Sequence, residues 1–376
     1  WWVSVERQTD SAMMACVITI LYALNLLFWL VVWLGFRKAN KSTTARLGQL
    51  SGEATNSLSV VVSLKNEAHN AAGLIQSLKA QVHPHFEVLL IDDQSQDETV
   101  TILRETIASD PRFCVLTRPT QEPPGKKSGL TYGIAQANHE RLVFTDADCR
   151  PGPHWLMIHA NLHRADPDAV WVGYGPLFPE KTWLNQFSRF ETQITALFTG
   201  AAIGLGLPYM AVGRNMSYTR TMFHRVNGFV THQHRLSGDD DLFIQSVRSQ
   251  KAGKVRYFFT PDSAVFSTAS QTWMQWFRQK KRHVSAGVGY PPSVVAILSG
   301  FHLTQLATWG MLVALFPAGI ALFLLRWGLI GCILKSNNFI QHEKERLSAS
   351  PALDFLYVIT SAVLPFVSVI RPQRRW

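Results

Sequence analysis

The sequence predicts an α/β fold with a mostly parallel sheet, placed between hydrophobic segments near the two ends of the chain. Strand-like apolar runs alternate with amphipathic stretches between residues 57 and 150, acidic residues follow two of these runs, and long uncharged stretches lie near both termini. Alternating strand and helix patterns are typical of parallel sheets with crossover helices. With 376 residues, 47% of them hydrophobic, the chain can hold one sizeable domain and membrane segments.

The N-terminal hydrophobic segment covers residues 12–36 and carries no charge. A helix that crosses a bilayer needs about 20 apolar residues, so this segment is predicted to be a transmembrane helix. Basic residues follow it directly, beginning with Arg37 and Lys38. The positive-inside rule then predicts that residues 1–11 lie outside the cytoplasm and that residues 37–56 form a basic juxtamembrane linker. A cleaved signal peptide, the alternative, carries its positive charge before the apolar stretch.

The C-terminal part of the chain contains two further hydrophobic regions, each interrupted by one charge. Arg326 interrupts the first region and Asp354 interrupts the second. The second region is compatible with a span, with a re-entrant element or with a helix that lies in the membrane interface. The predicted order is a transmembrane region with one or two spans over 291–335, a polar loop over 336–350, a membrane or interfacial segment over 351–370 and a basic tail over 371–376.

The middle of the chain, residues 57–290, is predicted to form a cytoplasmic α/β domain. Its strand-like runs, which are separated by stretches with helical spacing, occur at 57–63, 86–91, 113–116 and 141–145. Asp93 follows the second run, and Asp146 and Asp148 follow the fourth. Open α/β sheets bind ligands outside the carboxyl ends of their strands, so we expect the functional site at this edge.

Charge and cysteine content narrow the classes of partner. The net charge is +10, with basic residues clustered near the hydrophobic segments. This charge suits an anionic membrane surface or a phosphorylated substrate, and no nucleic-acid-binding module is recognisable, so no nucleic acid is expected as a partner. The four cysteines lack metal-ligand spacing, which fits a reduced compartment. Glycine-rich phosphate loops are also missing from the sequence.

Asp146 and Asp148 are the candidate metal ligands. Two carboxylates two positions apart at a strand end can present oxygen atoms to one hard divalent cation, Mg²⁺ or Mn²⁺, which can also bind a diphosphate. Such a cation neutralises the charge that develops on a nucleotide leaving group. The same spacing also occurs in ordinary turns. The metal-binding interpretation therefore depends on the predicted strand before the two acids and on the other acidic residues of the chain.

A second acidic group consists of Asp239, Asp240 and Asp241, directly before the apolar residue Leu242. Acidic residues at a helix N-terminus interact favourably with the helix dipole without any catalytic role. A carboxylate directed at an acceptor can instead act as the general base that deprotonates its hydroxyl group. The sequence favours this second interpretation when the two acidic groups are taken together.

Basic and amide side chains supply candidates for phosphate binding. Gln279 and Arg282 are three positions apart, so they would share one helix face close to the C-terminal hydrophobic region. A basic patch that contacts lipid head groups is the alternative, and the two roles are compatible. Lys126 follows a flexible glycine at the start of a predicted helix. Lys126 could reach a phosphate from this position. The alternative is that it is an ordinary solvent-exposed residue of a loop.

Taken in series, the motifs resemble glycosyltransferase family 2. The resemblance covers about residues 58–283, and each motif alone is modest, whereas their unbroken order is highly specific. The motifs are Lys65-Asn66-Glu67, Ile91-Asp92-Asp93-x-Ser95-x-Asp97-x-Thr99, Gly125-Lys126, Asp146-Ala147-Asp148, Gly213-Arg214-Asn215, Asn227-Gly228-Phe229, Gly238-Asp239-Asp240 and Gln279-x-x-Arg282. The resemblance implies a GT-A fold and sugar transfer with inversion at the anomeric carbon.

The resemblance also implies roles for individual residues. Asp239 takes the position of the family's catalytic base, with Asp240 as the second choice. Asp148 would bind the metal ion, with Asp146 beside it near the donor sugar or the ribose. Expected donor contacts, with Asp93 at the nucleotide base and Lys126 added from its position, are Glu67, Asp93, Lys126, Asp146, Gln279 and Arg282. Expected acceptor contacts are His283 and Asn215.

Two positions depart from the family pattern. His283 stands where membrane polysaccharide synthases of this family usually have a tryptophan that stacks on the acceptor sugar, which weakens the case for processive synthesis. Gly238 stands where the first acid of an acidic pair is usual, so one supporting carboxylate is lost.

The sequence therefore predicts a membrane-anchored inverting glycosyltransferase of polysaccharide biosynthesis in the cell envelope. Its partners would be a nucleotide-sugar donor, a UDP-sugar by family habit, and a lipid-linked or glycan acceptor at a bacterial-type inner membrane, with the catalytic domain in the cytoplasm. The alternatives are a processive synthase that extrudes its polymer and a catalytically inactive nucleotide-sugar-binding scaffold. The sugar, the acceptor and the oligomeric state stay open.

Overall fold

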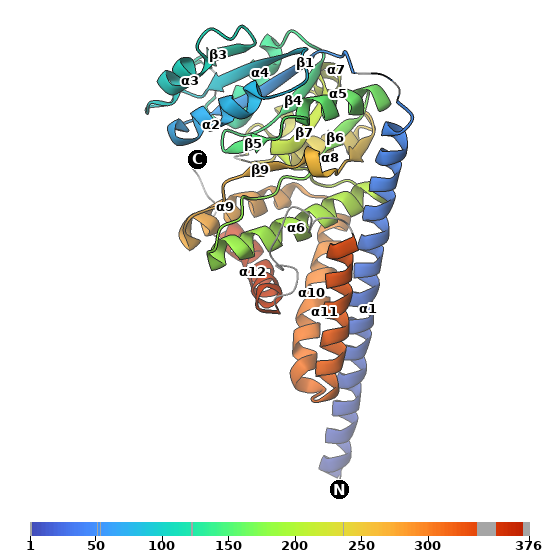
Figure 1. Ribbon diagram of the computed structural model, residues 1–376. Helices are drawn as coiled ribbons and strands as arrows, with labels where there is room; N and C mark the ends of the chain where they lie inside the picture. The colour runs from blue at the N-terminus through green and yellow to red at the C-terminus, as the bar shows by residue number, and fades with distance from the viewer. Residues whose placement is uncertain are drawn as a thin grey trace.

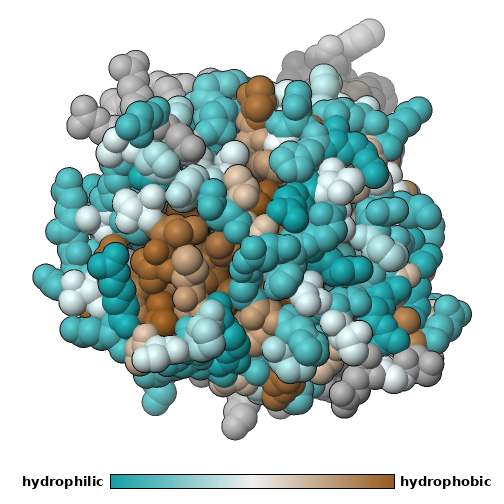
Figure 2. Space-filling model, turned by 90° about the horizontal axis from the view of Figure 1, so that it is seen from above, coloured by the Kyte–Doolittle hydropathy of each residue, from teal (hydrophilic) through white to brown (hydrophobic). Residues whose placement is uncertain are grey.

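The computed structural model describes residues 2–370 apart from residues 51, 53, 122, 236 and 337–350. An α/β head, residues 58–267, lies above a stalk of three long helices, α1, α10 and α11, with further helices between the two parts (Figure 1). Seen from above, the surface is mostly hydrophilic, and its broadest hydrophobic area is recessed (Figure 2).

The head is built on a seven-stranded sheet in the order β3-β2-β1-β4-β7-β6-β8. Its first strands are parallel and lie where the sequence predicts them: β1 (Leu58–Leu64), β2 (Phe86–Asp92), β3 (Phe113–Thr117) and β4 (Arg141–Phe144). β7 pairs antiparallel with both β4 and β6, and β6 pairs parallel with β8. The shorter strands are β5 (Cys149–Pro151), β6 (Val170–Val172), β7 (Met216–Thr219), β8 (Val255–Tyr257) and β9 (Val265–Ser267), of which β5 and β9 form a separate antiparallel pair. The predicted mostly parallel α/β sheet is confirmed.

Helices of the head pack on the sheet (Figure 1). α2 begins directly after β1 and buries Leu74, Ile75 and Leu78, which recur at helical spacing. These helices are α2 (Ala68–Lys79), α3 (Thr99–Ile107), α4 (Lys126–Gln136), α5 (Trp155–Ala165), α7 (Arg220–Arg225) and α8 (Asp241–Ser249).

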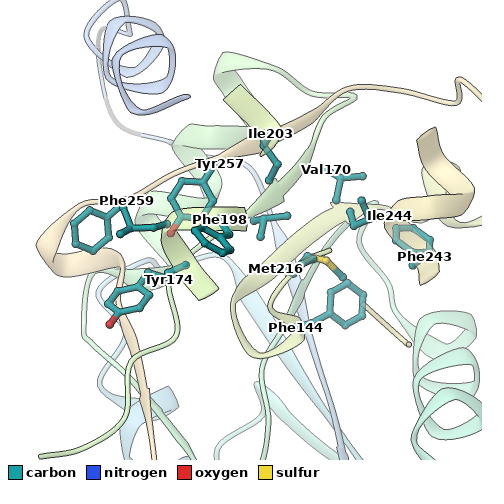
Figure 3. Packing of buried hydrophobic residues seen from close by; sticks show 14 of the residues in the cluster. Phe144, Val170, Tyr174, Phe198, Ile203, Met216, Phe243, Ile244, Tyr257 and Phe259 are labelled. Atoms are coloured by element: carbon teal, nitrogen blue, oxygen red, sulfur yellow. The ribbon is translucent and has the colours of Figure 1, made fainter. Parts of the chain in front are cut away.

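Alternate side chains of β1 point to opposite faces of the sheet and enter two separate cores. Val60 belongs to one core and Val61 to the other. In the larger core the ring of Tyr218 stacks between Phe144 and Phe243, with centroid distances of 4.5 Å and 4.4 Å. Figure 3 shows Phe144 and Phe243 among the side chains of this core. Each fully buried apolar side chain of this size contributes about 1.5–3 kcal/mol, so the core fixes the strand ends that carry the site.

The stalk contains the hydrophobic segments predicted from the sequence. Within the part of the chain that the structure describes, three helices are long and apolar enough to cross a membrane: Met13–Leu47, Pro292–Ala314 and Ala318–Lys335. They belong to α1 (Trp2–Leu47), α10 (Pro292–Ala314) and α11 (Ala318–Ser336). Region 291–335 thus forms two helices. Residues 337–350 of the predicted polar loop and the predicted tail 371–376 lie outside the described residues.

Three helices lie between the head and the stalk or beside the stalk. They are α6 (Trp183–Gly204), α9 (Trp273–Ala286) and α12 (Pro351–Ile370), and α12 packs on both α6 and α9. α6 crosses α1 in direct backbone contact, because a Cβ on Gly204 would lie 1.9 Å from the carbonyl oxygen of Gly35. Gly35 is next to the basic end of the apolar run, so this crossing sets α6 at the level where that run ends.

Buried polar side chains join α11 to α1, α10 and α12. The Arg326 guanidinium donates to both carboxylate oxygens of Asp354, at 2.9 and 3.2 Å, and to Asn25 Oδ1 at 3.0 Å. It also donates to Gln305, and Trp309 Nε1 donates to Asp354 at 3.1 Å. Ionisable groups inside apolar bundles need such partners. The two charges that interrupt the C-terminal hydrophobic regions therefore compensate each other.

Candidate active site

A cleft of about 550 Å³ opens at the carboxyl edge of the parallel strands. It is lined by residues that follow β1, β2 and β4, by the segments 210–214 and 237–241, and by α6 and α9. All but one of the site residues predicted from the sequence line it: Glu67, Asp93, Lys126, Asp146, Asp148, Asp239, Asp240, Gln279, Arg282 and His283. Residues as far apart in the sequence as 67 and 283 are thus brought to one place.

Asp93, directly after β2, is held by cations on both sides. Its carboxylate accepts a hydrogen bond from Arg118 and one from the backbone N–H of Gly125 at 3.0 Å, and Lys65 Nζ lies 3.6 Å away. Both Asp93 and Arg118 are buried. Sequence reasoning missed Arg118. Its position directly after β3, matching that of Asp93 after β2, was the only signal.

Asp146 and Asp148 lie in the turn between β4 and β5, next to Cys149. One possible ligand atom from each of the three residues lies within 4.8 Å of the others. Burial and the nearby charge of Asp146 raise the pKa of Asp148 to about 6, against the opposing effect of the Arg214 guanidinium. Burial also raises the pKa of the Cys149 thiol, so this group stays protonated and is a weak ligand. Two carboxylates, with waters and a diphosphate, suit Mg²⁺ or Mn²⁺. The residues therefore fit such a cation.

Lys126 joins the two acidic groups that the sequence placed far apart. Its ammonium lies 2.8 Å from Asp146 Oδ1 and 2.8 Å from Asp239 Oδ2. Burial alone would lower the pKa of Lys126, but the surrounding carboxylates raise it well above its ordinary value. Burial would likewise raise the pKa of Asp239, but the Lys126 ammonium lowers it. Asp239 is therefore an ionised carboxylate at neutral pH.

The other two acids of the second group are tied to the protein backbone. Asp240 accepts from the N–H groups of Gly213 at 3.0 Å and Asp241 at 2.7 Å, and burial and the charge of Asp239 raise its pKa to about 6. Asp241 accepts from the Ala211 N–H at 3.1 Å and from the Tyr290 hydroxyl at 2.6 Å. Of the three acids, Asp239 alone makes an ion pair with a cleft lysine.

Gly238 occupies the position where the family pattern has an acid. Its φ of +98° lies in the left-handed region, and a Cβ there would come within 2.6 Å of the Leu242 side chain. The local backbone therefore requires glycine, and the missing acid is a consequence of the turn that leads into Asp239.

α9 forms the wall of the cleft nearest the stalk. A capping box between Thr272 and Gln275 begins the helix. Gln279 accepts a hydrogen bond from Ser270 at 3.1 Å, and Lys280, which sequence reasoning did not single out, pairs with Glu191 of α6 at 2.7 Å. Arg282 and His283 lie one turn further along and also face the cleft. α6 and α9 thus close the cleft on the side of the hydrophobic helices.

Asn215 is the one predicted site residue that does not line the cleft. It is fully buried behind the 211–214 segment. Its amide donates to the carbonyl oxygens of Tyr174 at 2.7 Å and Ser263 at 2.8 Å, and its oxygen accepts from Trp155 Nε1 at 3.0 Å. An acceptor contact by Asn215 therefore disagrees with this geometry. The other two residues of this motif, Gly213 and Arg214, line the cleft, and neither was predicted to do so from the sequence.

Comparisons with known proteins find similarity to glycosyltransferases. Residues 59–226 match the model of glycosyl transferase family 2. The chain is 26% identical over 204 residues to the probable glycosyltransferase YdaM of Bacillus subtilis, covering 52% of this chain and 46% of that protein. It is 32% identical over 101 residues to the glycosyltransferase AglE of Haloferax volcanii, covering 26% of this chain and 33% of that protein. The matched regions span less than half the length of these two curated relatives.

A solved structure shares the fold over most of the chain. It is the mannosyltransferase PcManGT of Pyrobaculum calidifontis in complex with GDP-Man and Mn²⁺, with a TM-score of 0.56 and 18% sequence identity. The match covers 95% of this chain and 99% of that one. The predicted GT-A fold is thereby confirmed.

Proposed function

We propose that this chain, which carries a glycosyl transferase family 2 domain, transfers a sugar from a nucleoside-diphosphate sugar to a hydroxyl group of a membrane-associated lipid or glycan acceptor. The observation that carries the proposal is that Asp93, Asp148 and Asp239, which follow three different segments of the chain, line one cleft. Three acids so far apart in the sequence are not expected to share one cleft by chance, which supports a donor site, a metal site and a base there.

At the donor end of the cleft, Asp93 would receive the nucleotide base. Its pairing with Arg118 and Lys65 fixes the orientation of the carboxylate. A fixed orientation is needed for the carboxylate to accept hydrogen bonds from the edge of a nucleotide base. Asp146 and Asp148 would hold a divalent cation, which when bound supplies positive charge to the diphosphate. Gln279 and Arg282 on α9 would hold the phosphate oxygens from the opposite wall.

Asp239 would act as the general base. The acceptor oxygen forms a bond to the anomeric carbon while its proton passes to the Asp239 carboxylate, and the bond from that carbon to the phosphate oxygen breaks with its electron pair on the diphosphate. A single displacement of this kind inverts the anomeric configuration. Asp240, the second candidate, already accepts two backbone hydrogen bonds, which leaves less of its carboxylate available.

The acceptor would reach the cleft from the membrane side. α6 and α9 form that side of the cleft, and α6 crosses α1 at the end of the apolar run. We therefore propose that the head faces the cytoplasm at a bacterial-type inner membrane and that the acceptor is lipid-linked or otherwise held at the bilayer surface.

The test is nucleotide release by the purified full chain in detergent. UDP-glucose, UDP-N-acetylglucosamine and GDP-mannose are supplied with a membrane lipid extract, after EDTA treatment and with Mg²⁺ or Mn²⁺ restored. We expect release that needs the cation, a product of inverted configuration by NMR, and loss of at least about 1000-fold in kcat for Asp239→Asn with donor binding retained. Asp262→Asn, an exposed acid outside the cleft, is the matched control.

The outcomes separate the alternatives. Wild-type turnover by Asp239→Asn contradicts the assignment of the base. Long polymeric products would identify a processive synthase instead, and donor binding without any turnover across the panel would identify a nucleotide-sugar-binding scaffold.

A further inference from the structure

A buried lysine beside the cleft holds the segment that leads into Asp239. Lys127 lies in the first turn of α4, and its Nζ donates to the carbonyl oxygens of His232 at 2.6 Å and Arg235 at 2.7 Å. Burial lowers the pKa of Lys127 to about 8, so the ammonium group is still charged at neutral pH. Hydrogen bonds from a charged donor are roughly twice as strong as neutral ones.

The next residue of α4 adds a second contact to the same segment. Gln233 Nε2 donates to Ser128 Oγ at 2.7 Å. His232 is itself buried, with its ring 5.9 Å from that of Phe229. The first turn of α4 thus binds residues 232–235 through two of their backbone carbonyl groups and the Gln233 side chain.

These contacts lie only a few residues before Asp239. Gly238, with its positive φ, makes the turn between this segment and Asp239. Lys127 itself does not line the cleft, whereas its neighbour Lys126 does and pairs with Asp239. One turn of helix therefore contacts the carboxylate directly and also holds the backbone that carries it.

We propose that Lys127 is a positioning residue, which fixes the 232–235 segment and through it the Asp239 carboxylate. The inference rests on the proposed function, in which Asp239 is the base. Segments with few tertiary anchors open locally at low free-energy cost. A displacement of about 1 Å in a reacting group can cost about a hundredfold in rate. Losing the anchor should therefore affect the chemical step more than donor binding.

The test compares Lys127→Met with the wild-type full chain in detergent. Amide hydrogen exchange in peptides that cover residues 228–242 should be faster by at least about tenfold, because two carbonyl groups lose a charged donor. Exchange in the parallel strands should not change. For the nucleotide sugar that gives turnover in the screen above, kcat should fall by at least about tenfold and the donor KM should stay within about threefold.

Lys79→Met is the matched control. Lys79 Nζ also donates to two carbonyl oxygens, those of Thr106 at 2.7 Å and Ile107 at 3.0 Å, but these lie at the end of α3 outside the cleft lining. This variant should leave both the exchange of residues 228–242 and kcat unchanged. Lys127→Arg, which keeps a charged donor, should retain more of kcat than Lys127→Met.

Two results would overturn the inference. One is unchanged exchange in residues 228–242 of Lys127→Met, and the other is a rise in the donor KM with kcat unchanged. If Lys127→Met does not fold, Ser128→Ala removes the milder contact and must show the same pattern at smaller amplitude. Hydrogen exchange needs no turnover, so a wild-type chain that is inactive would contradict the proposed function and leave the anchoring result standing.

Discussion

Two buried histidines behind the cleft should make the head sensitive to acid. His159 and His163 lie one turn apart on α5 and are fully buried. His159 Nδ1 lies 2.8 Å and His163 Nε2 lies 3.1 Å from the Ser217 hydroxyl of β7, and His159 Nε2 lies 3.3 Å from Asn215 Oδ1. Burial lowers the pKa of His159 to about 3 and that of His163 to about 4. Both rings are therefore neutral in the folded protein.

The size of the effect follows from proton binding in the unfolded chain. There an ordinary histidine has a pKa of about 6.5, so between pH 6.5 and 4 the unfolded chain binds more protons than the folded one and the free energy of unfolding falls with falling pH. At pH 5, the difference of about 1.5 pH units from that pKa corresponds to about 2 kcal/mol for each histidine. The two together remove about 4 kcal/mol between pH 7.5 and pH 5.

The assay is thermal or urea unfolding of the full chain in detergent at pH 7.5 and pH 5, followed by near-UV circular dichroism. His163→Gln should shrink the loss of stability between these pH values by about 2 kcal/mol, even if Gln lowers stability at both. Comparing the two proteins cancels the effect of the acids in the cleft, which titrate in both. His154→Gln, a control at the exposed residue that directly precedes α5, should leave the loss unchanged. An equal loss in wild type and His163→Gln would refute the reasoning.

Three further predictions concern contacts that join the parts of the molecule. Arg326→Met should lower the free energy of unfolding in detergent by about 3–5 kcal/mol, because it leaves the buried Asp354 carboxylate without its cation. Adding Asp354→Asn should restore part of this loss, whereas two independent sites would give additive losses. Tyr290→Phe should cost about 1.5–3 kcal/mol through the lost hydrogen bond to Asp241, measured by the same unfolding. Gly204→Leu should prevent the close crossing of α6 and α1 and give little monodisperse protein on size exclusion, whereas an unchanged yield would contradict that packing.

The first half of the head could be predicted from the sequence because its first two strands are long and mostly apolar. β1 and β2 have seven residues each, and β2 ends in Asp92 with Asp93 directly after it, so these strands and the functional edge of the sheet could be recognised from the sequence. The second half was harder to predict. β6, β8 and β9 have three residues each, too few for any periodicity to emerge. Their antiparallel and mixed pairing is set by tertiary packing, which local pattern does not encode.

Within the site, the acids predicted at strand ends do lie in one cleft, and their roles stay predictions, whereas positions decided by burial could not be predicted. Asn215 stands in a motif with two cleft residues, yet its amide turns inward to satisfy backbone groups. Arg118 carries no motif and is recognisable only once β2 and β3 are neighbours. In the sequence, Arg326 and Asp354 each interrupt a hydrophobic region. Their pairing could not be predicted, because it depends on how two helices pack.

The charges in the cleft give a reason to expect that donor and cation bind together. Among the described residues that line it, seven carboxylates face five ammonium or guanidinium groups. Asp93, Asp240 and Asp241 have partners supplied by the protein, whereas Asp146 and Asp239 share the single ammonium of Lys126. A bare diphosphate would add negative charge to this surplus, and a divalent cation between the Asp146 and Asp148 carboxylates would offset it. Donor affinity measured by calorimetry should therefore fall by at least about tenfold when EDTA removes the cation. Equal affinity with and without EDTA would mean that the basic side chains alone hold the phosphates.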